Sequence, residues 1–219
     1  MSQAEQLAAI AAQFKDLPAA KPITAALEDF AKTFDPSKAV KVGDKLPAFT
    51  LSDATGKQVS SADLLAGDSD GQQQRFLLLT FYRGQWCPYC NVALQHLQRR
   101  LDGFRARGVT LVALTPELPD ASLSTAEKNG LAFPVLTDRH NRLARSLGIV
   151  YDQSSARDVH RQMGVDVAAS NGDDSYEMPV PATMLVDGEG VVRELYLEPD
   201  YRQRMDPEVA LAWVDALRK

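Results

Sequence analysis

The stretch FLLLTFYRGQWCPYC, residues 76–90, joins an apolar run to two closely spaced cysteines. The run at 76–82 has the length and composition of one buried β-strand. Pro88 is suited to the first turn of a helix, and the leucines that follow it recur at helical spacing. The stretch therefore predicts a strand, a short loop and a helix that begins at the cysteine pair.

Strands and helices continue to alternate after this stretch. The expected helix at about 87–107 ends at Gly108, and VTLVALT at 109–115 predicts a second strand. The series continues with a helix ending at AEKNG, a strand FPVLT, a helix HNRLARSL, an antiparallel hairpin of ATMLVD and VVRELYL, and a closing helix PEVALAWVDALRK. This order predicts an α/β fold with a central mixed β-sheet flanked by helices.

The first forty residues have a different pattern. Apolar side chains recur at helical spacing twice, first around Ile10 and again around Leu27. We therefore expect an N-terminal helical extension at 1–40, made of two amphipathic helices, and one main domain at 41–219.

Two polar segments interrupt the main domain. The first, GDSDGQQQ at 67–74, is expected to be a loop. The second, at about 152–178, is rich in Ser, Asn, Gly and Asp, and we interpret it as an insertion with one short helix near 156–163.

The composition is that of an ordinary globular protein. The 219 residues are 45% hydrophobic and 24% charged, and the formal net charge is -5. A negative chain has no field that attracts nucleic acid or an anionic membrane, so neither partner is expected. The start MSQAEQLAAIAAQFKD lacks the pattern of a signal peptide, which favours a cytoplasmic location. That compartment keeps thiols reduced and argues against a static disulfide.

The two cysteines are spaced for redox chemistry. Cys90 lies on the inward stripe of the expected helix with Leu94 and Leu97, whereas Cys87 lies one turn earlier, at the exposed end. The helix dipole favours an anion there and Arg83 adds to the effect, so we expect a lowered pKa for Cys87. A Cys-x-x-Cys pair at a strand-to-helix junction is typical of a redox site, with Cys87 attacking and Cys90 closing an internal disulfide.

Two other interpretations of the cysteines stay open. A zinc site needs further ligands, and His96, His140 and His160 lie on unrelated expected elements. Two inert core cysteines are the other alternative, although buried structural thiols rarely follow a tryptophan at the start of a helix. We expect surface positions for the histidines. The sequence carries no metal, flavin or nucleotide motif, so no cofactor is expected beyond the sulfur pair.

Three phrases, taken in order, resemble the thioredoxin-fold superfamily and most closely its peroxiredoxin family, that of alkyl hydroperoxide reductase C and thiol-specific antioxidant. They are KVGDKLPAFTLSDATGKQVSSADL, GVTLVALTPELPDASLSTAEKNGLAFPVLTDRHNRLARSLGI and PATMLVDGEGVVRELYL. The likeness covers about 41–206 and implies a thioredoxin-like fold.

The expected site departs from that family. Its Pro and its Thr or Ser that cradle the peroxide are replaced by Thr80 and Gly84, and its Arg at the late strand is replaced by Pro181. The tetrad Cys-Pro-Tyr-Cys is similar to the glutaredoxin site, and Trp86 before it is a thioredoxin feature. The likeness implies that Pro181 forms the cis peptide that faces the cysteines. Tyr89 is expected at the rim of the site.

The tail EPDYRQRMDP is similar to a subgroup of peroxiredoxin-like proteins. It brings Asp200, Arg202, Arg204 and Asp206 close together, and a solvated charge network is favoured over a catalytic role.

Three functions follow from these features. The first is a thiol-dependent peroxidase, in which Cys87 becomes a sulfenic acid and a thioredoxin-type reductant recycles the Cys87–Cys90 disulfide. The second is a thiol-disulfide oxidoreductase that acts on protein or glutathione disulfides. The third is a non-catalytic redox sensor, in which the N-terminal helices serve association, for example in a homodimer.

Overall fold

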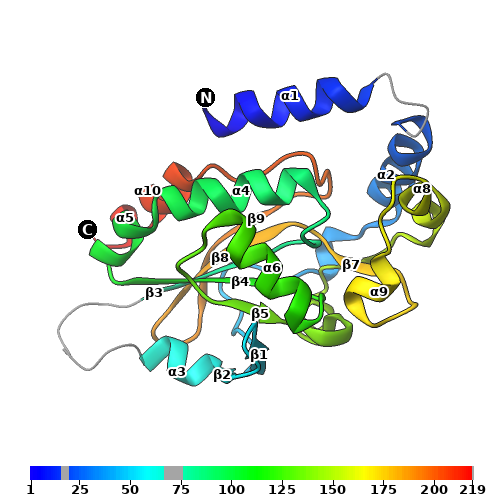
Figure 1. The fold of residues 1–219 in the computed structure, drawn as a ribbon. Helices are drawn as coiled ribbons and strands as arrows, with labels where there is room; N and C mark the ends of the chain where they lie inside the picture. The colour runs from blue at the N-terminus through cyan, green and yellow to red at the C-terminus, as the bar shows by residue number, and fades with distance from the viewer. Residues whose placement is uncertain (16–19, 67–75, 219) are drawn as a thin grey trace.

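A computed structural model describes most of the chain, namely residues 1–15, 20–66 and 76–218 (Figure 1). The polar loop expected at 67–74 lies outside the described residues. Within the described ranges, no helix combines the length and the apolar character that crossing a membrane requires.

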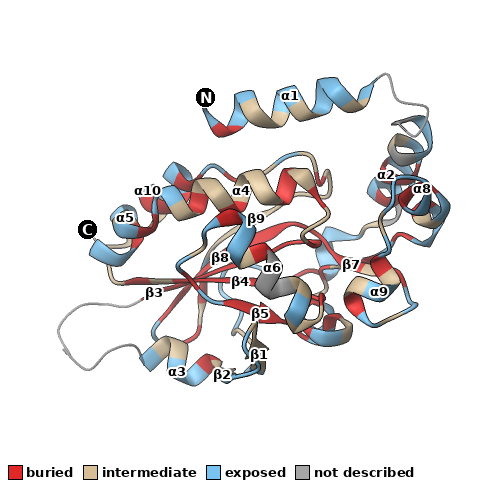
Figure 2. Ribbon diagram, viewed as in Figure 1, coloured by how far each residue is buried: buried red, intermediate tan, exposed pale blue. Residues whose placement is uncertain are grey.

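The fold is organised around β3 (Phe76–Phe81), a strand in which every residue is buried. Leu77 and Leu79 belong to one core cluster, whereas Phe76 and Leu78 belong to another, because alternate side chains of a strand point to opposite faces. A strand that is buried on both faces needs cover on both sides, and Figure 2 shows this burial at the centre of the sheet.

Seven strands of the described chain form one mixed sheet in the order β2-β1-β5-β4-β3-β8-β9. These strands, with β3, are β1 (Thr50–Asp53), β2 (Gln58–Ser60), β4 (Val109–Thr115), β5 (Val135–Thr137), β8 (Ala182–Asp187) and β9 (Val192–Leu197). β3 pairs in parallel with β4 and antiparallel with β8, and Phe81 lies opposite Ala182. The segment after β3 and the segment before β8 therefore leave the sheet at the same edge.

Helices cover both faces, so the expected α/β fold is confirmed (Figure 1). The face of the cysteine helix carries α1 (Gln3–Lys15), α4 (Pro88–Arg99), α5 (Leu101–Ala106), α6 (Pro119–Asn129) and α10 (Pro207–Leu217). The core cluster of the opposite face includes residues of α2 (Ala20–Thr33), α3 (Ser61–Ala66) and α7 (Arg142–Ser146). Two single 3-10 turns, Pro36–Lys38 and Arg139–Asn141, connect these elements.

Both helices expected in the first forty residues are present, and they pack on the rest of the protein. α1 lies along α4, where Leu7 and Ile10 contact the core cluster of that face. In α2, Leu27 and Phe30 are buried, and the Phe30 ring lies 4.0 Å from that of Tyr151. The division of the chain at residue 40 stays a prediction.

Two helices differ from the expected bounds. The helix expected at 87–107 breaks at Arg100, whose φ and ψ of -104° and 4° are not helical and separate α4 from α5. The helix expected from His140 begins at Arg142, because His140 and Asn141 adopt left-handed φ values of 58° and 52°.

The polar span near 152–178 is more structured than expected. The expected short helix is present as α8 (Arg157–Gln162), after the 3-10 turn Ser154–Ala156. A further helix, α9 (Val167–Asn171), and a two-stranded sheet of β6 (Val150–Asp152) and β7 (Glu177–Pro179) were not expected. The sheet pairs the two ends of the span and closes it into a compact lobe.

Candidate active site

The two cysteines lie at the start of α4 as free thiols. Cys87 is the residue before the helix, Pro88 begins it, and the Cys90 amide donates to the carbonyl of Cys87 at 3.1 Å. Cys90 is fully buried, as its place on the inward stripe predicted. The exposed position expected for Cys87 is wrong, because this residue is only 1% exposed.

Arg204 brings a positive charge to both sulfurs. Its Nη2 lies 3.2 Å from Cys90 Sγ and 3.9 Å from Cys87 Sγ. The charge network expected for the tail is correct for Asp200 and Arg202, which form a 2.8 Å ion pair. It is wrong for Arg204, which reaches the site because the tail after β9 folds back over the start of α4.

Arg83 is the second cation of the site. It is 2% exposed, and its guanidinium lies 4.0 Å from the ring centre of Tyr201 and 4.6 Å from that of Trp86. One guanidinium nitrogen donates to the side chain of Gln153. The proximity of Arg83 to the cysteines agrees with the prediction from the sequence.

The two thiols ionise differently. Burial raises the pKa of Cys87 well above its ordinary value, and its hydrogen bond with Cys90 adds to the shift. Burial also opposes ionisation of Cys90, but the hydrogen bond from Cys87 and the charges of Arg204 and Arg83 hold its pKa well below the ordinary value. The lowered pKa expected for Cys87 is therefore found at Cys90, because the hydrogen bond between the thiols favours the anion on Cys90 and Arg204 lies closer to Cys90.

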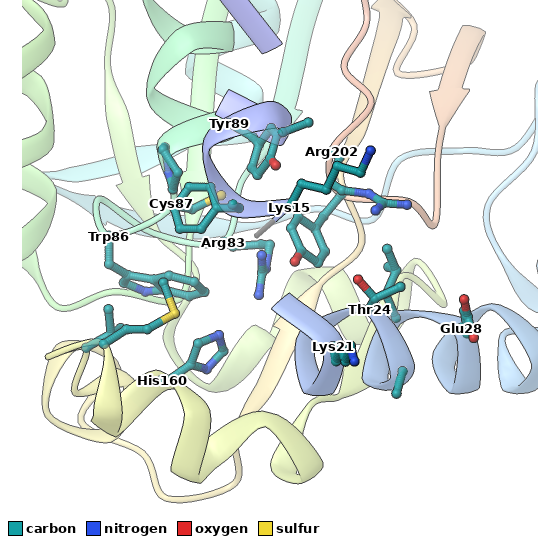
Figure 3. Close-up of a pocket in the computed structure, with 18 of the residues that line it drawn as sticks. Lys15, Lys21, Thr24, Glu28, Arg83, Trp86, Cys87, Tyr89, His160 and Arg202 are labelled. Carbon is teal, nitrogen blue, oxygen red and sulfur yellow. The ribbon is translucent and has the colours of Figure 1, made fainter. Parts of the chain in front are cut away.

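A cavity of about 620 Å³ opens onto Cys87 (Figure 3). α1, α2 and the polar lobe form its walls together with the segment at 83–89. Its lining is largely apolar and includes Ala11, Ala12, Phe14, Ala25, Leu27, Trp86, Tyr89, Met163, Val165 and Tyr201. Four cations also line it, namely Lys15, Lys21, Arg83 and Arg202, with Glu28 as the single carboxylate among the described residues.

His160 lines this cavity as well, which the sequence did not indicate. It is 5% exposed, and its ring lies 5.0 Å from that of Trp86. Burial, and then the charge of Arg83, lowers its pKa to about 4. The surface position expected for His160 is wrong because the polar lobe folds against the cysteine loop.

The other two histidines lie elsewhere. His140 pairs with Asp173 at 2.9 Å, and His96 lies beside Arg99 near the end of α4. Within the described ranges, no group of three or more metal-ligating side chains is brought together, so nothing supports the zinc interpretation.

Glu117 is a second residue of the site that was not expected from the sequence. It follows β4, is fully buried, and accepts hydrogen bonds of 3.0 and 2.9 Å from the amide of Gln85. Burial raises its pKa to about 8, the Gln85 amide lowers it, and the charge of Cys90 raises it further. Its position directly after a buried strand, at the edge where the cysteine loop leaves the sheet, is the signal that could have identified it.

Pro181 lies beside the site, but its expected cis peptide is wrong. No cis peptide bond occurs in the described residues. The Val180 amide donates to the carbonyl of Ile149 at 2.7 Å, and the Pro181 carbonyl accepts from Glu198 at 3.2 Å, which holds this segment extended. Pro181 lines a small cavity of about 20 Å³ with Cys90 and other residues.

The expected rim residue Tyr89 is 5% exposed and lines the large cavity from inside, with its ring 5.8 Å from that of Tyr201. Thr80, at the family's proline position, is buried and shares a 3.0 Å hydrogen bond with Thr183. Gly84 occupies the position of the family's Thr or Ser and has no side chain that could bind a peroxide.

A mixed sheet with a dithiol at the start of its first central helix defines a thioredoxin-fold redox protein. The model of the AhpC/TSA family matches residues 42–195, so the chain belongs to this family. The chain is 31% identical over 106 residues to "Putative peroxiredoxin Rv2521" of Mycobacterium tuberculosis, a match that covers 48% of this chain and 62% of that protein. It is 25% identical to Peroxiredoxin Bcp of Escherichia coli over 175 residues, 80% of this chain and 96% of that protein.

Two further similarities bear on the fold and on the chemistry. The chain is 23% identical to the thiol-disulfide oxidoreductase ResA of Geobacillus thermodenitrificans, over 76% of this chain and 75% of that protein. The crystal structure of peroxidoxin BcpB from Mycobacterium tuberculosis covers 82% of this chain and 99% of its own, with a TM-score of 0.62 at 20% identity. This structural similarity shows the fold alone.

Proposed function

We propose that the protein is a thiol-dependent peroxidase in which Cys87 attacks the hydroperoxide and Cys90 resolves the product. The observation that carries the proposal is the arrangement of the sulfurs. Cys87 lines the large cavity, whereas Cys90 lies behind it against Arg204 and lines only the small one. A substrate in the large cavity therefore meets Cys87 first.

The hydrogen bond between the thiols allows Cys87 to be activated. In the reduced pair Cys90 ionises more readily than Cys87. Transfer of the Cys87 proton to an ionised Cys90 produces a Cys87 thiolate, and Arg83 and Arg204 favour an anion at either position. The thiolate attacks one peroxide oxygen, the O–O bond breaks, and Cys87 becomes a sulfenic acid, while the alkoxide leaves as the alcohol with the proton that Cys90 received. The Cys90 thiolate then attacks this sulfur and forms the disulfide, and hydroxide leaves and takes a proton from the solvent.

The cavity suits a hydroperoxide with an organic body. Its volume of about 620 Å³ far exceeds what hydrogen peroxide requires, and its largely apolar lining favours a hydrocarbon group. A thioredoxin- or glutathione-type reductant then restores the two thiols by exchange.

A second candidate function is thiol-disulfide exchange on protein or glutathione disulfides. The family's peroxide-cradling Pro and its Thr or Ser are replaced by Thr80 and Gly84 in this chain, and the cysteines form a Cys-Pro-Tyr-Cys tetrad. Both features favour thiol-disulfide exchange. The same thiolate and the same resolving cysteine serve this reaction, because only the bond that Cys87 attacks differs.

Single cysteine variants separate these functions. We expect Cys87→Ser to lose hydroperoxide reduction, and Cys90→Ser to accumulate a sulfenic acid that a selective reagent traps after one equivalent of cumene hydroperoxide. The matched assay measures reduction of insulin and of mixed glutathione disulfides. If wild-type protein consumes hydroperoxides no faster than free cysteine but reduces insulin, the exchange function replaces the peroxidase.

A further inference from the structure

The attacking cysteine is almost completely enclosed by the described part of the chain. Cys87 is 1% exposed, Cys90 behind it is fully buried, and the large cavity opens onto Cys87. The walls of the cavity are anchored, because Gln3 ties α1 to the carbonyl of Met205 and Leu27 of α2 is buried in the core. A partner that reacts with Cys87 in this structure therefore has to enter the cavity.

The volume of the cavity limits what can enter. Pockets of this size hold small organic molecules, and about 620 Å³ accommodates a ligand of tripeptide size. A protein reductant such as thioredoxin carries its cysteine on a folded domain, and a domain cannot follow its sulfur into such a space. A small thiol does not meet this obstacle, because it can approach Cys87 from inside the cavity.

The wall of the cavity is positively charged, although the formal net charge of the protein is -5. Its described lining contains four cations and one carboxylate. Arg202 is already paired with Asp200 at 2.8 Å. The other three cations, Lys15, Lys21 and Arg83, form no ion pair with a described residue. Three positive charges are thus available to an anionic ligand.

Arg83 provides the most deeply buried of these charges. It is 2% exposed, and one guanidinium nitrogen donates to Gln153, but its Nε has no hydrogen-bond partner among the described residues. Unpartnered guanidinium N–H groups bind carboxylates strongly, because both the charge and the donor geometry match. Lys15, at the end of α1, and Lys21, at the start of α2, are exposed (Figure 3). The cavity therefore offers one inner and two outer positions for negative groups.

We propose that the reductant that recycles the disulfide is a low-molecular-weight thiol with two carboxylates, which enters this cavity and attacks Cys87. Glutathione has this chemistry. Its two carboxylates match the unpaired cations, and its ammonium group matches Glu28, the single carboxylate of the described lining. The inference rests on the proposed function for the origin of the disulfide, and it excludes a thioredoxin-type protein as the direct reductant.

The exchange takes place in two steps. The thiolate of a first small thiol attacks the Cys87 sulfur, the bond to Cys90 breaks, and Cys90 leaves as a thiolate. Arg204, whose Nη2 lies 3.2 Å from Cys90 Sγ in the reduced pair, stabilises this leaving group. A second small thiol then attacks the small-molecule sulfur of the mixed disulfide and releases Cys87.

The two steps balance. Two electrons pass from the two small thiols to the protein, and the small thiols leave as one small disulfide. Of the two hydrogens that they lose, one returns to Cys87, and the other goes to the solvent, or to Cys90 where that thiol is protonated.

Reduction of the oxidised full-length chain tests the proposal. The disulfide is formed with diamide, so no hydroperoxide is used and a failure of the peroxidase function leaves the result unaffected. We expect glutathione to react roughly ten-fold faster, per thiolate, than glutathione diethyl ester, because blocked carboxylates lose several partly exposed charge pairs. Reduced thioredoxin at the same thiol concentration should be slower than glutathione. An ester as fast as glutathione, or a faster thioredoxin, overturns the proposal.

A charge variant locates the small thiol. Lys21→Met should lower the rate with glutathione about two- to five-fold and leave the rate with the diethyl ester unchanged. Lys32→Met is the matched control, because Lys32 lies on the same helix, is exposed, and pairs with Asp29 outside the cavity lining. Equal glutathione rates in the two variants overturn the proposal.

The position of the mixed disulfide gives a further measurement. Treated with oxidised glutathione, Cys90→Ser should form a mixed disulfide at Cys87, which mass spectrometry detects. Cys87→Ser should form little, because Cys90 is fully buried and does not line the large cavity. Equal formation of the mixed disulfide in both variants overturns the proposal.

Discussion

The side-chain amide of Gln3 donates a 2.9 Å hydrogen bond to the main-chain carbonyl of Met205, 202 residues away in the sequence. Gln3 also reaches the carbonyl of Arg204 at 3.4 Å and is itself 3% exposed. The first turn of α1 therefore holds the tail segment whose guanidinium lies against the cysteine sulfurs.

Replacing Gln3 by Ala should loosen this tail. We expect the free energy of unfolding to fall by about 1 kcal/mol, because a buried hydrogen bond is lost. Iodoacetamide should react more slowly at pH 7, because Arg204 is held less firmly against the thiolate. Gln13→Ala, at an exposed position of the same helix, is the control and should behave as wild type. If the two variants are indistinguishable in denaturation and alkylation, α1 does not support the site.

Replacing Arg204 by Met should raise the pKa of Cys90, the thiol that ionises more readily. The cation lies 3.2 Å from Cys90 Sγ, and loss of such a neighbour shifts a pKa by about 1–3 units. The pH profile of alkylation of the reduced protein measures this shift. Arg202→Met removes a cation two residues away that pairs with Asp200, and its profile should stay close to that of wild type. An unchanged profile for Arg204→Met contradicts a role for this residue in ionisation.

Filling the cavity should discriminate between substrates by size. Ala25 lines the cavity from α2, and replacing it with Trp should lower kcat/KM for cumene hydroperoxide roughly ten-fold or more. The value for hydrogen peroxide should hardly change, because a small substrate needs little of that volume. Ala31→Trp, at an exposed position of the same helix outside the cavity lining, is the control. A parallel loss for both peroxides would show that the cavity does not bind the organic group.

Glu117 should also affect the pH dependence of stability. Its pKa rises from 4.5 to about 8 on folding, so in this interval the native carboxyl is protonated and the unfolded one is ionised. The unfolded state binds fewer protons, and stability therefore falls as pH rises, by about 1.4 kcal/mol per pH unit. The wild type should lose stability relative to Glu117→Gln across this interval, whereas the thiols titrate in both proteins. A stability difference that is constant with pH, measured by urea denaturation, rules out the raised pKa.

Gly84 should not tolerate a side chain. A Cβ atom at this position would lie 2.5 Å from Trp86 Nε1 and 2.7 Å from Glu117 Oε1. We expect Gly84→Ala to destabilise the fold by about 1–3 kcal/mol and to disturb the cysteine loop. Gly103 in α5 is the matched control, since its nearest contact would be 3.7 Å, and Ala there should be neutral or stabilising by up to about 1 kcal/mol. Equal thermal denaturation of the two variants would contradict the crowding at Gly84.

The sequence predicted those parts of the site that depend on local spacing. The apolar run of β3, the helix that begins at Pro88 and the inward position of Cys90 all follow from periodicity within a few residues. The burial of Cys87 does not, because distant segments cover it. The position of Glu117 after a buried strand places it at the edge of the sheet where the cysteine loop begins, but the local pattern does not show that its carboxyl accepts from the Gln85 amide.

The tail is another part of the site whose contacts local sequence patterns did not predict. Its charges were expected to be solvated, and the Asp200–Arg202 pair fits that expectation, but Arg204 contacts sulfur atoms more than a hundred residues earlier in the chain. The resemblance to the family was informative about order and fold. The resemblance could not predict that Arg204, from the tail, would lie beside the cysteines. The family's arginine position is occupied by Pro181 in this chain.

Arg204 lies 114 residues after Cys90 in the chain, so both thiols emerge from the ribosome much earlier than the arginine that contacts them. A nascent chain that stops before Arg204 carries both thiols and Arg83 but lacks the other arginine of the site. Both cysteines are therefore synthesised well before the residue that helps to lower the pKa of Cys90. The thiols reach their final reactivity only when the tail folds back over α4.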